Sequence, residues 1–324
     1  MKAFVTHYPQ QYRQQGVALI TALLIAALVT VAAVAMASRQ QLDIRRTGNM
    51  LEADQAYLYA LAGEAWAEQM LLEDKKTAAE TDTLTEDWAT EIPPLPVEGG
   101  TVSGKLEDLQ GRFNLNNLLD NQGKADAKQV KILQSLLSQV SQAEEEVQLS
   151  PFIANRIVDW IDADLNASAD GAEDLDYLNA AVPYRAANQF MVSNTELAAI
   201  AGFSPKAAVA LSPLVTCLPE VTKVNVNTAP EMVLMGLHEN ITPSIASELV
   251  EYRQDKPFED ANQFVKKLKD DYEIELDPQF IDVKTEYFLL SVNAAIGRTE
   301  LRMYSLLARK GNKVSAIRRS LGTL

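Results

Sequence analysis

The chain has 324 residues, a length that suits two or three modest domains. Its 44 acidic and 29 basic side chains give a formal net charge of −15, and this sign opposes a general nucleic-acid binder. The single cysteine excludes an intrachain disulfide and a cysteine-rich zinc module, and two histidines leave little for histidine-dependent catalysis. The composition therefore favours a scaffold or transport component over an ordinary enzyme.

The N-terminus combines a short cationic leader with an apolar segment. Residues 1–16 contain Lys2 and Arg13 but no acid, and residues 17–37 contain no charged side chain. As a helix, residues 17–37 would span about 31 Å, which matches the hydrocarbon core of a bilayer. A secretory signal would have a shorter apolar core followed by its cleavage site, whereas here the small residue Gly16 precedes the core. The sequence thus predicts a membrane anchor, whose orientation the basic residues at both ends do not decide.

The order of leader, Gly16 and apolar run resembles a type IV prepilin signal, which a membrane-bound prepilin peptidase cuts after the glycine. The resemblance implies a mature chain that begins at Val17 and keeps its anchor. A plain single-pass anchor with an incidental glycine is the alternative. Most pilins carry glutamate at the fifth mature position, where its carboxylate is thought to meet the N-terminal amine of a neighbour, but this chain has Thr21. Because an unpaired carboxylate in hydrocarbon is costly, we expect a subunit that sits at an end of its assembly.

After the anchor, residues 39–72 keep a helical pattern. No proline interrupts them, and apolar residues recur at three- and four-residue steps, the spacing of one helix face. These residues are Leu42, Leu51, Tyr57, Leu58, Leu61, Trp66, Met70 and Leu71. The pattern predicts that the helix continues and packs against a globular head, with Tyr57 and Trp66 in contact with a sheet. Residues 73–100 are polar and contain prolines, so we expect a loop with one helical turn around Trp88.

The head combines strands at both ends with helices between them. Residues 101–108 and 111–116 predict two strands joined by a turn. Residues 280–284, 287–296, 298–309 and 313–318 predict an antiparallel meander. Residues 125–276 are mostly helical in pattern. A sheet divided in sequence by a helical block predicts an α+β fold with an inserted all-α domain.

The helical block contains a weak internal repeat. Residues 113–116, FNLN, recur as VNVN at 224–227, and residues 153–158, IANRIV, recur as IASELV at 245–250. Residues 187–190 and 261–264 both read ANQF. Repeated capping chemistry without shared ancestry is the alternative, because asparagine favours caps and turns wherever it occurs.

Residues 159–176 form an acidic loop. They carry seven carboxylates, which are Asp159, Asp162, Asp164, Asp170, Glu173, Asp174 and Asp176. After a helical segment, Asp162, Asp164, Asn166, Ser168, Asp170 and Glu173 follow EF-hand loop positions 1, 3, 5, 7, 9 and 12. Position 6 is Ala167 instead of glycine, so we expect a different conformation with some of the same ligands. Oxygen donors without sulfur or histidine favour one or two calcium ions over zinc, and a solvated acidic loop is the alternative.

Several longer segments resemble the K-family minor pseudopilin of bacterial type II secretion systems. They include GVALITALLIAALV, EDLQGRFNLNNLL, IVDWIDAD, GAEDLDY, PYRAANQ and KVNVNTAP, and the resemblance runs over most of the chain. It implies a pilin-like α+β fold, in which a long N-terminal helix packs on an antiparallel sheet, with a large inserted all-α domain. The implied parts are a prepilin leader (1–16), a transmembrane helix (17–37), a first pilin-like part (38–124), the inserted domain (125–220), and a helix-hairpin-helix-like segment with the closing strands (221–324).

The resemblance also implies a location and partners. Such a protein lies in the bacterial inner membrane with its C-terminal head in the periplasm, and it joins the I- and J-type minor pseudopilins at the pseudopilus tip. There it primes assembly and helps folded exoproteins cross the outer membrane. The prepilin peptidase, the inner-membrane secretion platform and the exoproteins are the other expected partners. Calcium binding in the helical domain is a known property of K-family heads, and no catalytic residue is expected.

Two other functions compete with this one. Residues 224–264 are similar to helix-hairpin-helix modules, so a membrane-anchored DNA-binding protein of a DNA-uptake pilus is one alternative. Its phosphate-binding hairpin would be residues 238–243, which lack glycine and include Glu239, so we expect no nucleic-acid partner. A carboxylate-pair hydrolase built on the acidic loop is the other, but no nucleophile has a recognisable spacing. Cys217 is expected to be buried, and His238 to cap a helix or face solvent.

Overall fold

The computed structural model of the protein describes residues 17–77, 81–144, 146–147 and 149–323. By its internal contacts the chain forms two compact units, Met1–Gln55 and Ala56–Leu324. The α-helices are α1 Val17–Thr77, α2 Ala127–Ala143, α3 Ile153–Ile161, α4 Asp174–Leu178, α5 Pro205–Leu211, α6 Glu231–Leu237, α7 Pro243–Asp255 and α8 Ala261–Tyr272. Short 3-10 helices are η1 Asp87–Ala89, η2 Leu115–Leu118, η3 Asn194–Ala199 and η4 Pro278–Phe280. The strands are β1 Ile92–Val97, β2 Gly100–Asp108, β3 Phe113–Asn114, β4 Val215–Thr216, β5 Val224–Asn225, β6 Ile281–Asp282, β7 Tyr287–Ile296, β8 Thr299–Lys310 and β9 Lys313–Leu321.

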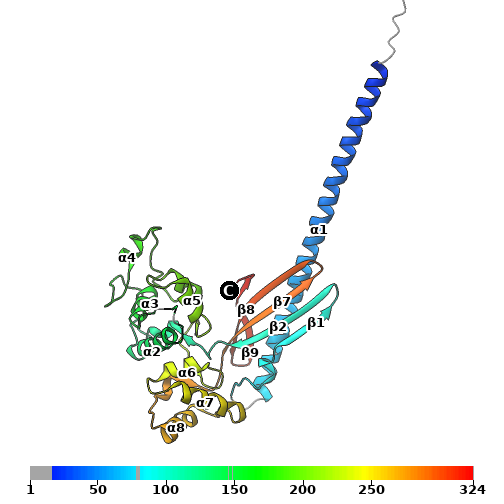
Figure 1. Ribbon diagram of the computed structural model, residues 1–324. Coiled ribbons are helices and arrows are strands. Elements are labelled where there is room, and N and C mark those ends of the chain that lie inside the picture. The colour runs from blue at the N-terminus through cyan, green and yellow to red at the C-terminus, as the bar shows by residue number, and fades with distance from the viewer. Residues whose placement is uncertain (1–16, 78–80, 145, 148, 324) are drawn as a thin grey trace, which may run out of the picture. The chain divides into compact units, whose positions relative to one another are not determined.

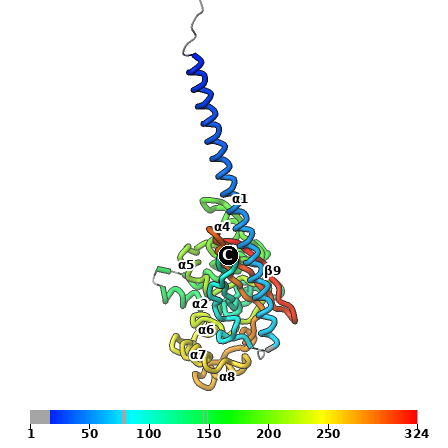
Figure 2. The backbone as a smooth tube through the Cα atoms, turned by 90° about the vertical axis from the view of Figure 1, so that its right-hand side faces the viewer, coloured from blue at the N-terminus to red at the C-terminus, as the bar shows by residue number. Residues whose placement is uncertain are grey.

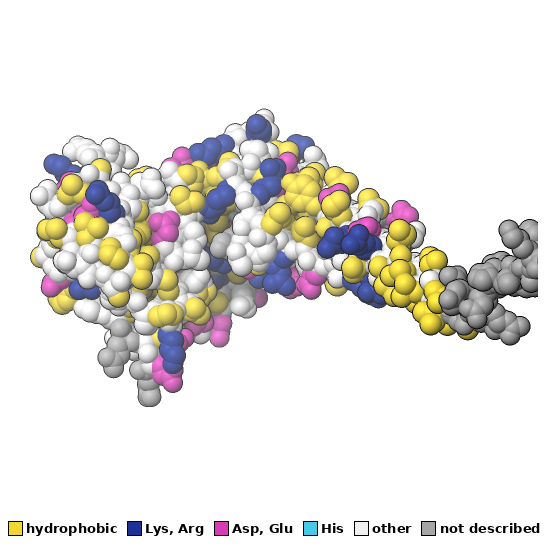
Figure 3. Space-filling model, turned by 90° about the horizontal axis from the view of Figure 1, so that it is seen from above, with side chains coloured by type: hydrophobic (Ala, Val, Ile, Leu, Met, Phe, Trp, Pro, Cys, Tyr) yellow, Lys and Arg dark blue, Asp and Glu magenta, His cyan; other side chains and the backbone are white. Residues whose placement is uncertain are grey.

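The first unit contains the N-terminal part of α1. One 18-residue window of this helix has a mean hydropathy of 2.8 and is not buried, and hydrophobic side chains cover the N-terminal part of the helix in Figure 3. Among the described residues, α1 is the one helix long and apolar enough to cross a membrane. The Thr21 hydroxyl donates within the helix to the carbonyl oxygens of Val17 and Ala18, each at 3.0 Å. This hydroxyl therefore needs no partner outside its own helix in an apolar phase.

In the second unit, α1 covers one face of a five-stranded antiparallel sheet (Figure 1). The strand order is β1-β2-β7-β8-β9, so β2 and β7 are neighbours although the helical block separates them in sequence. The contact face of the helix includes Ala60, Ala67 and Leu71, which pack with Phe288 and Leu307 of the sheet. The predicted α+β fold, with a helical block inserted between strands of one sheet, is confirmed.

The sequence pattern identified the contact face of α1 only in part: Leu71 packs on the sheet as predicted, and Trp66 lines a pocket with β1 and β2 but stays partly exposed. Tyr57 is 38% exposed and Trp66 is 47% exposed, whereas Ala60 is fully buried. A Cβ added at Gly63 would lie 3.4 Å from the side chain of Val292, so the helix runs close to the sheet. Such a close approach selects small side chains on the contact face, and alanine carries a weaker periodic signal than leucine.

Several strand predictions were wrong in detail. β1 lies in the segment predicted as a loop, and its prolines, which cannot donate to a ladder, fit the sheet edge where β1 lies. Residues 111–116 were predicted as a strand joined by a turn to 101–108, but only Phe113–Asn114 forms a strand, β3, which lies outside the five-stranded sheet and pairs in parallel with β4. Residues 280–284 do not join the meander either, because β6 pairs in parallel with β5. β7, β8 and β9 form the predicted antiparallel meander, and η1 supplies the predicted helical turn.

Polar bonds fasten α1 to the two C-terminal strands. Glu64, which is 4% exposed, accepts hydrogen bonds from Arg319 at 2.6 and 2.7 Å and from the Ser305 hydroxyl at 2.5 Å. Near the end of the helix, Asp74 pairs with the buried Arg309 at 2.8 Å. Because both buried charges have partners of opposite sign, the helix is held in register without an isolated buried charge.

The helical block consists of two similar halves, which we call the first and second helical units, and each is closed by a pair of two-residue parallel strands. In the first helical unit β3 pairs with β4, and in the second helical unit β5 pairs with β6. One hydrophobic cluster runs through both, from Phe113 to Val283. Helices α6, α7 and α8 lie together, and α4 lies at the opposite end of the block from α8 (Figures 1 and 2). The internal repeat is therefore a structural one.

Buried asparagines fix the alignment of the two units. Asn116 bonds both backbone polar groups of Met191, at 3.0 and 2.9 Å, and Asn227 bonds those of Phe258 in the same way, each at 2.9 Å. Residues 191–197 therefore correspond to 258–264, and the predicted match of 187–190 with 261–264 is wrong. The first helical unit contains a long connection, residues 162–192, where the second has only residues 256–259. We call residues 162–192 the acidic insertion.

Asp108 at the end of β2 connects the sheet to the second helical unit. Its buried carboxylate accepts hydrogen bonds from the side chains of Asn225 at 2.9 Å, Thr228 at 2.5 Å and Thr285 at 2.6 Å. The backbone N–H of Gln110 donates to the same carboxylate at 2.6 Å. Burial raises the pKa of the Asp108 carboxyl, while the hydrogen bonds from Thr228, Thr285 and Gln110 act in the opposite sense. The four donors together satisfy the buried carboxylate.

Candidate metal centre

The acidic insertion begins where α3 ends, and a buried carboxylate organises its start. Asp159 on α3 is 1% exposed and accepts the backbone N–H groups of Ser168 at 3.1 Å and Ala172 at 2.9 Å. A Cβ at Gly171 would lie 1.8 Å from the Asp159 carboxylate, so the loop can approach this closely only at a glycine. The insertion is thereby folded back over the end of α3.

Three carboxylates of the insertion converge on one point. Asp162, Asp164 and Glu173 each offer an oxygen within 4.8 Å of the others. Oδ1 of Asp162 and both carboxylate oxygens of Glu173 are buried and have no hydrogen-bond partner among the described residues. Buried carboxylate oxygens without donors are costly, and a hard divalent cation would offset that cost. The donor set, oxygen alone, is the one that calcium prefers.

The same burial raises two pKa values in this cluster. Burial, followed by the charges of Asp164 and Asp159, raises the pKa of Asp162 to about 6. Burial, followed by the charges of Asp162 and Asp159, raises the pKa of Glu173 to about 7. Both shifts mean that a proton or another cation stabilises the cluster.

The remaining predicted ligands lie around these three. Asp170 is exposed and has a φ of 60°. Asp174 pairs with Arg185 at 3.5 Å and accepts the backbone N–H of Ala186 at 3.1 Å. Asp176 accepts the backbone N–H of Glu173 at 3.0 Å and so fixes the turn that carries this residue. Together with Asp159, these carboxylates shape the loop around the converging group.

The loop differs from an EF-hand in conformation, which the alanine at position 6 led us to expect. The left-handed residue of the loop is Asp170, at position 9, rather than Ala167. The backbone N–H of Asn166, at position 5, donates to Asp164 at 2.7 Å. The three carboxylates that converge occupy positions 1, 3 and 12. The spacing thus located a cluster, and the backbone between these positions follows its own path.

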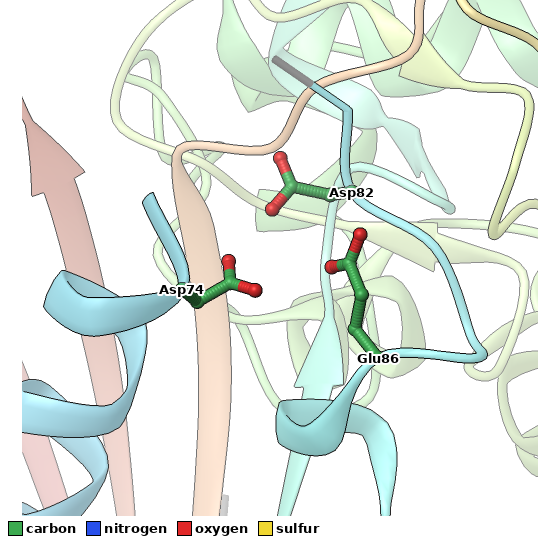
Figure 4. Close-up of side chains that lie close together, drawn as sticks. All are labelled: Asp74, Asp82 and Glu86. Carbon is green, nitrogen blue, oxygen red and sulfur yellow. The ribbon is translucent and has the colours of Figure 1, made fainter. Parts of the chain in front are cut away.

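A second group of carboxylates lies near the end of α1, where Asp74, Asp82 and Glu86 point toward one another (Figure 4). A cation of the chain already serves this group, because the Arg309 guanidinium pairs with both aspartates. Glu86 accepts a hydrogen bond from the indole N–H of Trp88 at 2.5 Å. We therefore interpret this group as an internal ion-pair cluster and not as a metal site.

The predicted processing and assembly residues lie at the start of the chain. Gly16 falls outside the described residues, and Val17 is the first residue of α1. Thr21 lies on the exposed surface of this helix. Cys217 is 6% exposed, which confirms that it is buried, and its burial raises the pKa of its thiol.

The hairpin between α6 and α7 uses its own backbone groups. The N–H of Asn240 donates to Nδ1 of His238 at 3.1 Å, and the N–H of Ile241 donates to the His238 carbonyl at 3.0 Å. His238 is the C-cap of α6, so its predicted capping role is confirmed. Two backbone N–H groups that a phosphate would need are therefore engaged within the hairpin.

The sequence pattern did not reveal the charged residues that hold Ala56–Leu324 together, namely Glu64, Arg309 and Asp108. Arg309 follows the apolar run Leu306-Leu307-Ala308 on a predicted strand. A charge in such a run can indicate a buried pair, since an unpaired charge is rarely buried. The spacing does not identify the partner, because Asp74 lies more than two hundred residues away in the chain.

The fold and the site define a class of protein. An apolar helix that could cross a membrane continues onto an antiparallel sheet, and a large helical block with a converging carboxylate group interrupts that sheet in sequence. These are the features of a pilin-like membrane-anchored protein with an enlarged head.

Comparison with known proteins identifies the family. Two family models of type II secretion system protein K match residues 111–220 and 224–269. The chain is 37% identical to type II secretion system protein K of Pseudomonas aeruginosa, over 95% of this chain and 93% of that protein. It is 34% identical to the protein K of Aeromonas hydrophila, over 97% of this chain and 99% of that protein. The crystal structure of the GspK-GspI-GspJ complex from enterotoxigenic Escherichia coli contains a chain that matches with a TM-score of 0.74 and 27% identity, over 86% of this chain and 100% of that one. The chain belongs to the type II secretion system protein K family of minor pseudopilins, as its sequence resemblance predicted.

Proposed function

We propose that this chain is the end subunit of the type II secretion pseudopilus and joins the I- and J-type minor pseudopilins at its tip. There it primes assembly and aids the export of folded proteins across the outer membrane. The observation that carries the proposal is the match, with a TM-score of 0.74, to a chain of the solved GspK-GspI-GspJ complex. The names of the curated relatives describe a secretion-system component, and we propose no catalytic activity for this chain.

Two features of this chain support an end position. A head enlarged by a helical block fits at the end of a filament, but it would collide with its neighbours if it were repeated along a shaft. Thr21 satisfies its hydroxyl within its own helix and needs no amine from a neighbour. A subunit with this residue therefore loses little when one of its sides has no neighbour.

We also propose how the chain is processed and placed. Prepilin peptidase cuts between Gly16 and Val17, α1 remains in the bacterial inner membrane as a single span, and the head lies in the periplasm. The inner-membrane secretion platform and the exported proteins are further partners at successive steps. Support comes from the apolar N-terminal part of α1, which is long and apolar enough to cross a membrane.

We propose that the acidic insertion binds calcium. Asp162, Asp164 and Glu173 would hold the ion, because they converge and because three of their oxygens are buried without donors among the described residues. Calcium would supply positive charge that cancels their repulsion and orders the loop. The other carboxylates, Asp159, Asp170, Asp174 and Asp176, shape the loop or bind a second ion.

Co-purification tests the assembly role. A soluble form that begins at Gln40 is mixed with the soluble heads of the I- and J-type minor pseudopilins from the same bacterium, and the mixture is separated by size. We expect one complex that contains all three heads. The head of the major shaft pseudopilin serves as the matched control and should not be retained. Retention of the shaft head in place of the I- and J-type heads would contradict the end position.

A further inference from the structure

The acidic insertion exposes an unusual share of the large apolar side chains. Among the described residues after α1, 14 such side chains are exposed, and seven of them lie between Leu165 and Val192. In the second helical unit the corresponding connection exposes none, and its Phe258 is buried. Single exposed apolar residues are ordinary on a protein surface, but a concentration in one short segment marks an interaction site.

Helix α4 presents two of these side chains on one side, and a third follows the helix in the chain. Tyr177 points inward, is 1% exposed, and packs edge-on against Trp160 at 5.3 Å between ring centroids. Leu175 and Leu178 are three residues apart, the spacing of one helix face, and are 76% and 42% exposed. Val182, four residues further along the chain, is 77% exposed. The buried tyrosine thus fixes α4 with its leucines directed outward.

Hydrogen bonds hold the rest of the insertion against the block. The Tyr184 hydroxyl donates to the carbonyl oxygen of Ala199 at 2.6 Å. The backbone N–H of Asn188 donates to the carbonyl oxygen of Trp160 at 2.9 Å. The apolar side chains of α4 therefore belong to a surface of fixed shape, on which a partner can bind without first ordering a loose loop.

The charge of the insertion identifies the kind of partner. Residues 162–192 contain six acidic side chains and one basic side chain, Arg185. Asp164, Asp170 and Asp176 are exposed. One divalent cation at the converging carboxylates would leave this segment negative. Exposed apolar side chains on an acidic segment are complementary to an apolar face that also carries lysine or arginine.

We infer that Leu175, Leu178 and Val182 form the centre of a docking surface for a partner protein whose contact face is apolar and ringed by basic side chains. The second helical unit completes the same fold without such a segment, so packing of the block does not account for these side chains. Burial of the leucines drives association, and the acidic side chains of the insertion select the partner. The inference rests on the proposed calcium site only for the calcium arm of the test below.

A peptide selection tests this docking surface through the chemistry of the peptides that bind it. The full chain is held in phosphatidylcholine nanodiscs with calcium, and a random-peptide phage library is selected on it after depletion on empty nanodiscs. We expect enriched peptides that carry lysine or arginine beside leucine, phenylalanine or tryptophan. Their binding should fall at least fivefold on the variant Leu175→Gln/Leu178→Gln/Val182→Asn and should weaken as salt is raised. It should stay unchanged on Val209→Asn, which alters an equally exposed valine on α5 (73%).

A second measurement covers the case in which the triple variant does not fold. An enriched peptide with a benzophenone group is cross-linked to the unmodified chain, and attachment is expected within residues 174–192. The inference is overturned if the peptide attaches elsewhere, if acidic or uncharged peptides are enriched, or if the peptides bind the triple variant equally well. It is also overturned if lipid or a second copy of this chain occupies the docking surface. Removal of calcium should reduce binding at this surface. Co-purification with the I- and J-type heads tests the assembly role separately, so either proposal can fail without the other.

Discussion

Replacing Glu173 by glutamine should stabilise the head in the absence of calcium and should reduce the stabilisation that calcium gives. The folded-state pKa of Glu173 is about 7, above its ordinary value of 4.5, so the ionised carboxylate destabilises the fold. The penalty is absent at low pH, grows as the pH rises from about 4.5 to about 7, and is complete above that range. Glutamine has nearly the same shape and carries no charge, so it removes this penalty.

The magnitude follows from the raised pKa. For a side chain as buried as Glu173, a pKa rise of this size lowers the free energy of unfolding by about 3 kcal/mol at about pH 8. The new amide is buried in place of the carboxylate oxygens that lack donors among the described residues, which costs about 1–2 kcal/mol. Without calcium, Glu173→Gln should therefore stabilise the head by about 1–2 kcal/mol. The variant also loses a calcium ligand, so its affinity for calcium should fall at least about tenfold. Removing only a residue that hydrogen-bonds to a metal ligand already lowers metal affinity about 10–100-fold.

Urea unfolding of the soluble form at about pH 8, with a chelator and with millimolar calcium, measures both effects. Glu251→Gln is the matched control, because it alters an exposed glutamate on α7 and should change neither curve. The reasoning is refuted if Glu173→Gln is less stable than the parent in chelator, or if calcium stabilises both proteins equally.

Three further predictions follow from the same structure. Calcium should bind more weakly at about pH 5.5 than at about pH 8, and binding should release protons, because protons compete with calcium for Asp162 and Glu173. Calorimetry in buffers of different ionisation enthalpy measures both effects, and an affinity that does not depend on pH would contradict the prediction. Arg309→Met should destabilise the head by about 3–5 kcal/mol in urea unfolding, because the buried Asp82 and the half-buried Asp74 lose the guanidinium that pairs with them. A loss below about 1 kcal/mol would show that these ion pairs contribute little. Thr21→Glu should impair assembly or move the subunit from the tip, as seen by gold labelling of isolated pseudopili; unchanged placement would remove the argument from this residue.

The sequence predicted the elements whose signal is local. β7 occupies the predicted residues 287–296, and the helix of the apolar run continues through the predicted residues 39–72. The capping role of His238 and the burial of Cys217 also followed from their neighbours in the chain. In each case the residues that determine the outcome lie within a few positions of one another, so a window of sequence contains the necessary information.

Elements that depend on distant residues were missed. β3 and β6 have two residues each, and their partners lie about 100 and 57 residues away, so no local pattern reveals their pairing. The contact face of α1 was identified only in part because a close approach to the sheet, felt at Gly63, replaces leucine by alanine there. Spacing located the acidic loop but not which carboxylates converge, since that depends on how Asp159 folds the loop back.

The bonds between α1 and the C-terminal strands have a mechanical consequence. Glu64 and Asp74 lie ten residues apart along the helix, and each is tied across to a strand of the meander. A pull along the helix axis would load both ion pairs and the buried apolar contacts between them in shear at the same time. The bonds would therefore not open one after another. A head attached in this way can resist an axial pull on α1 without peeling from the helix.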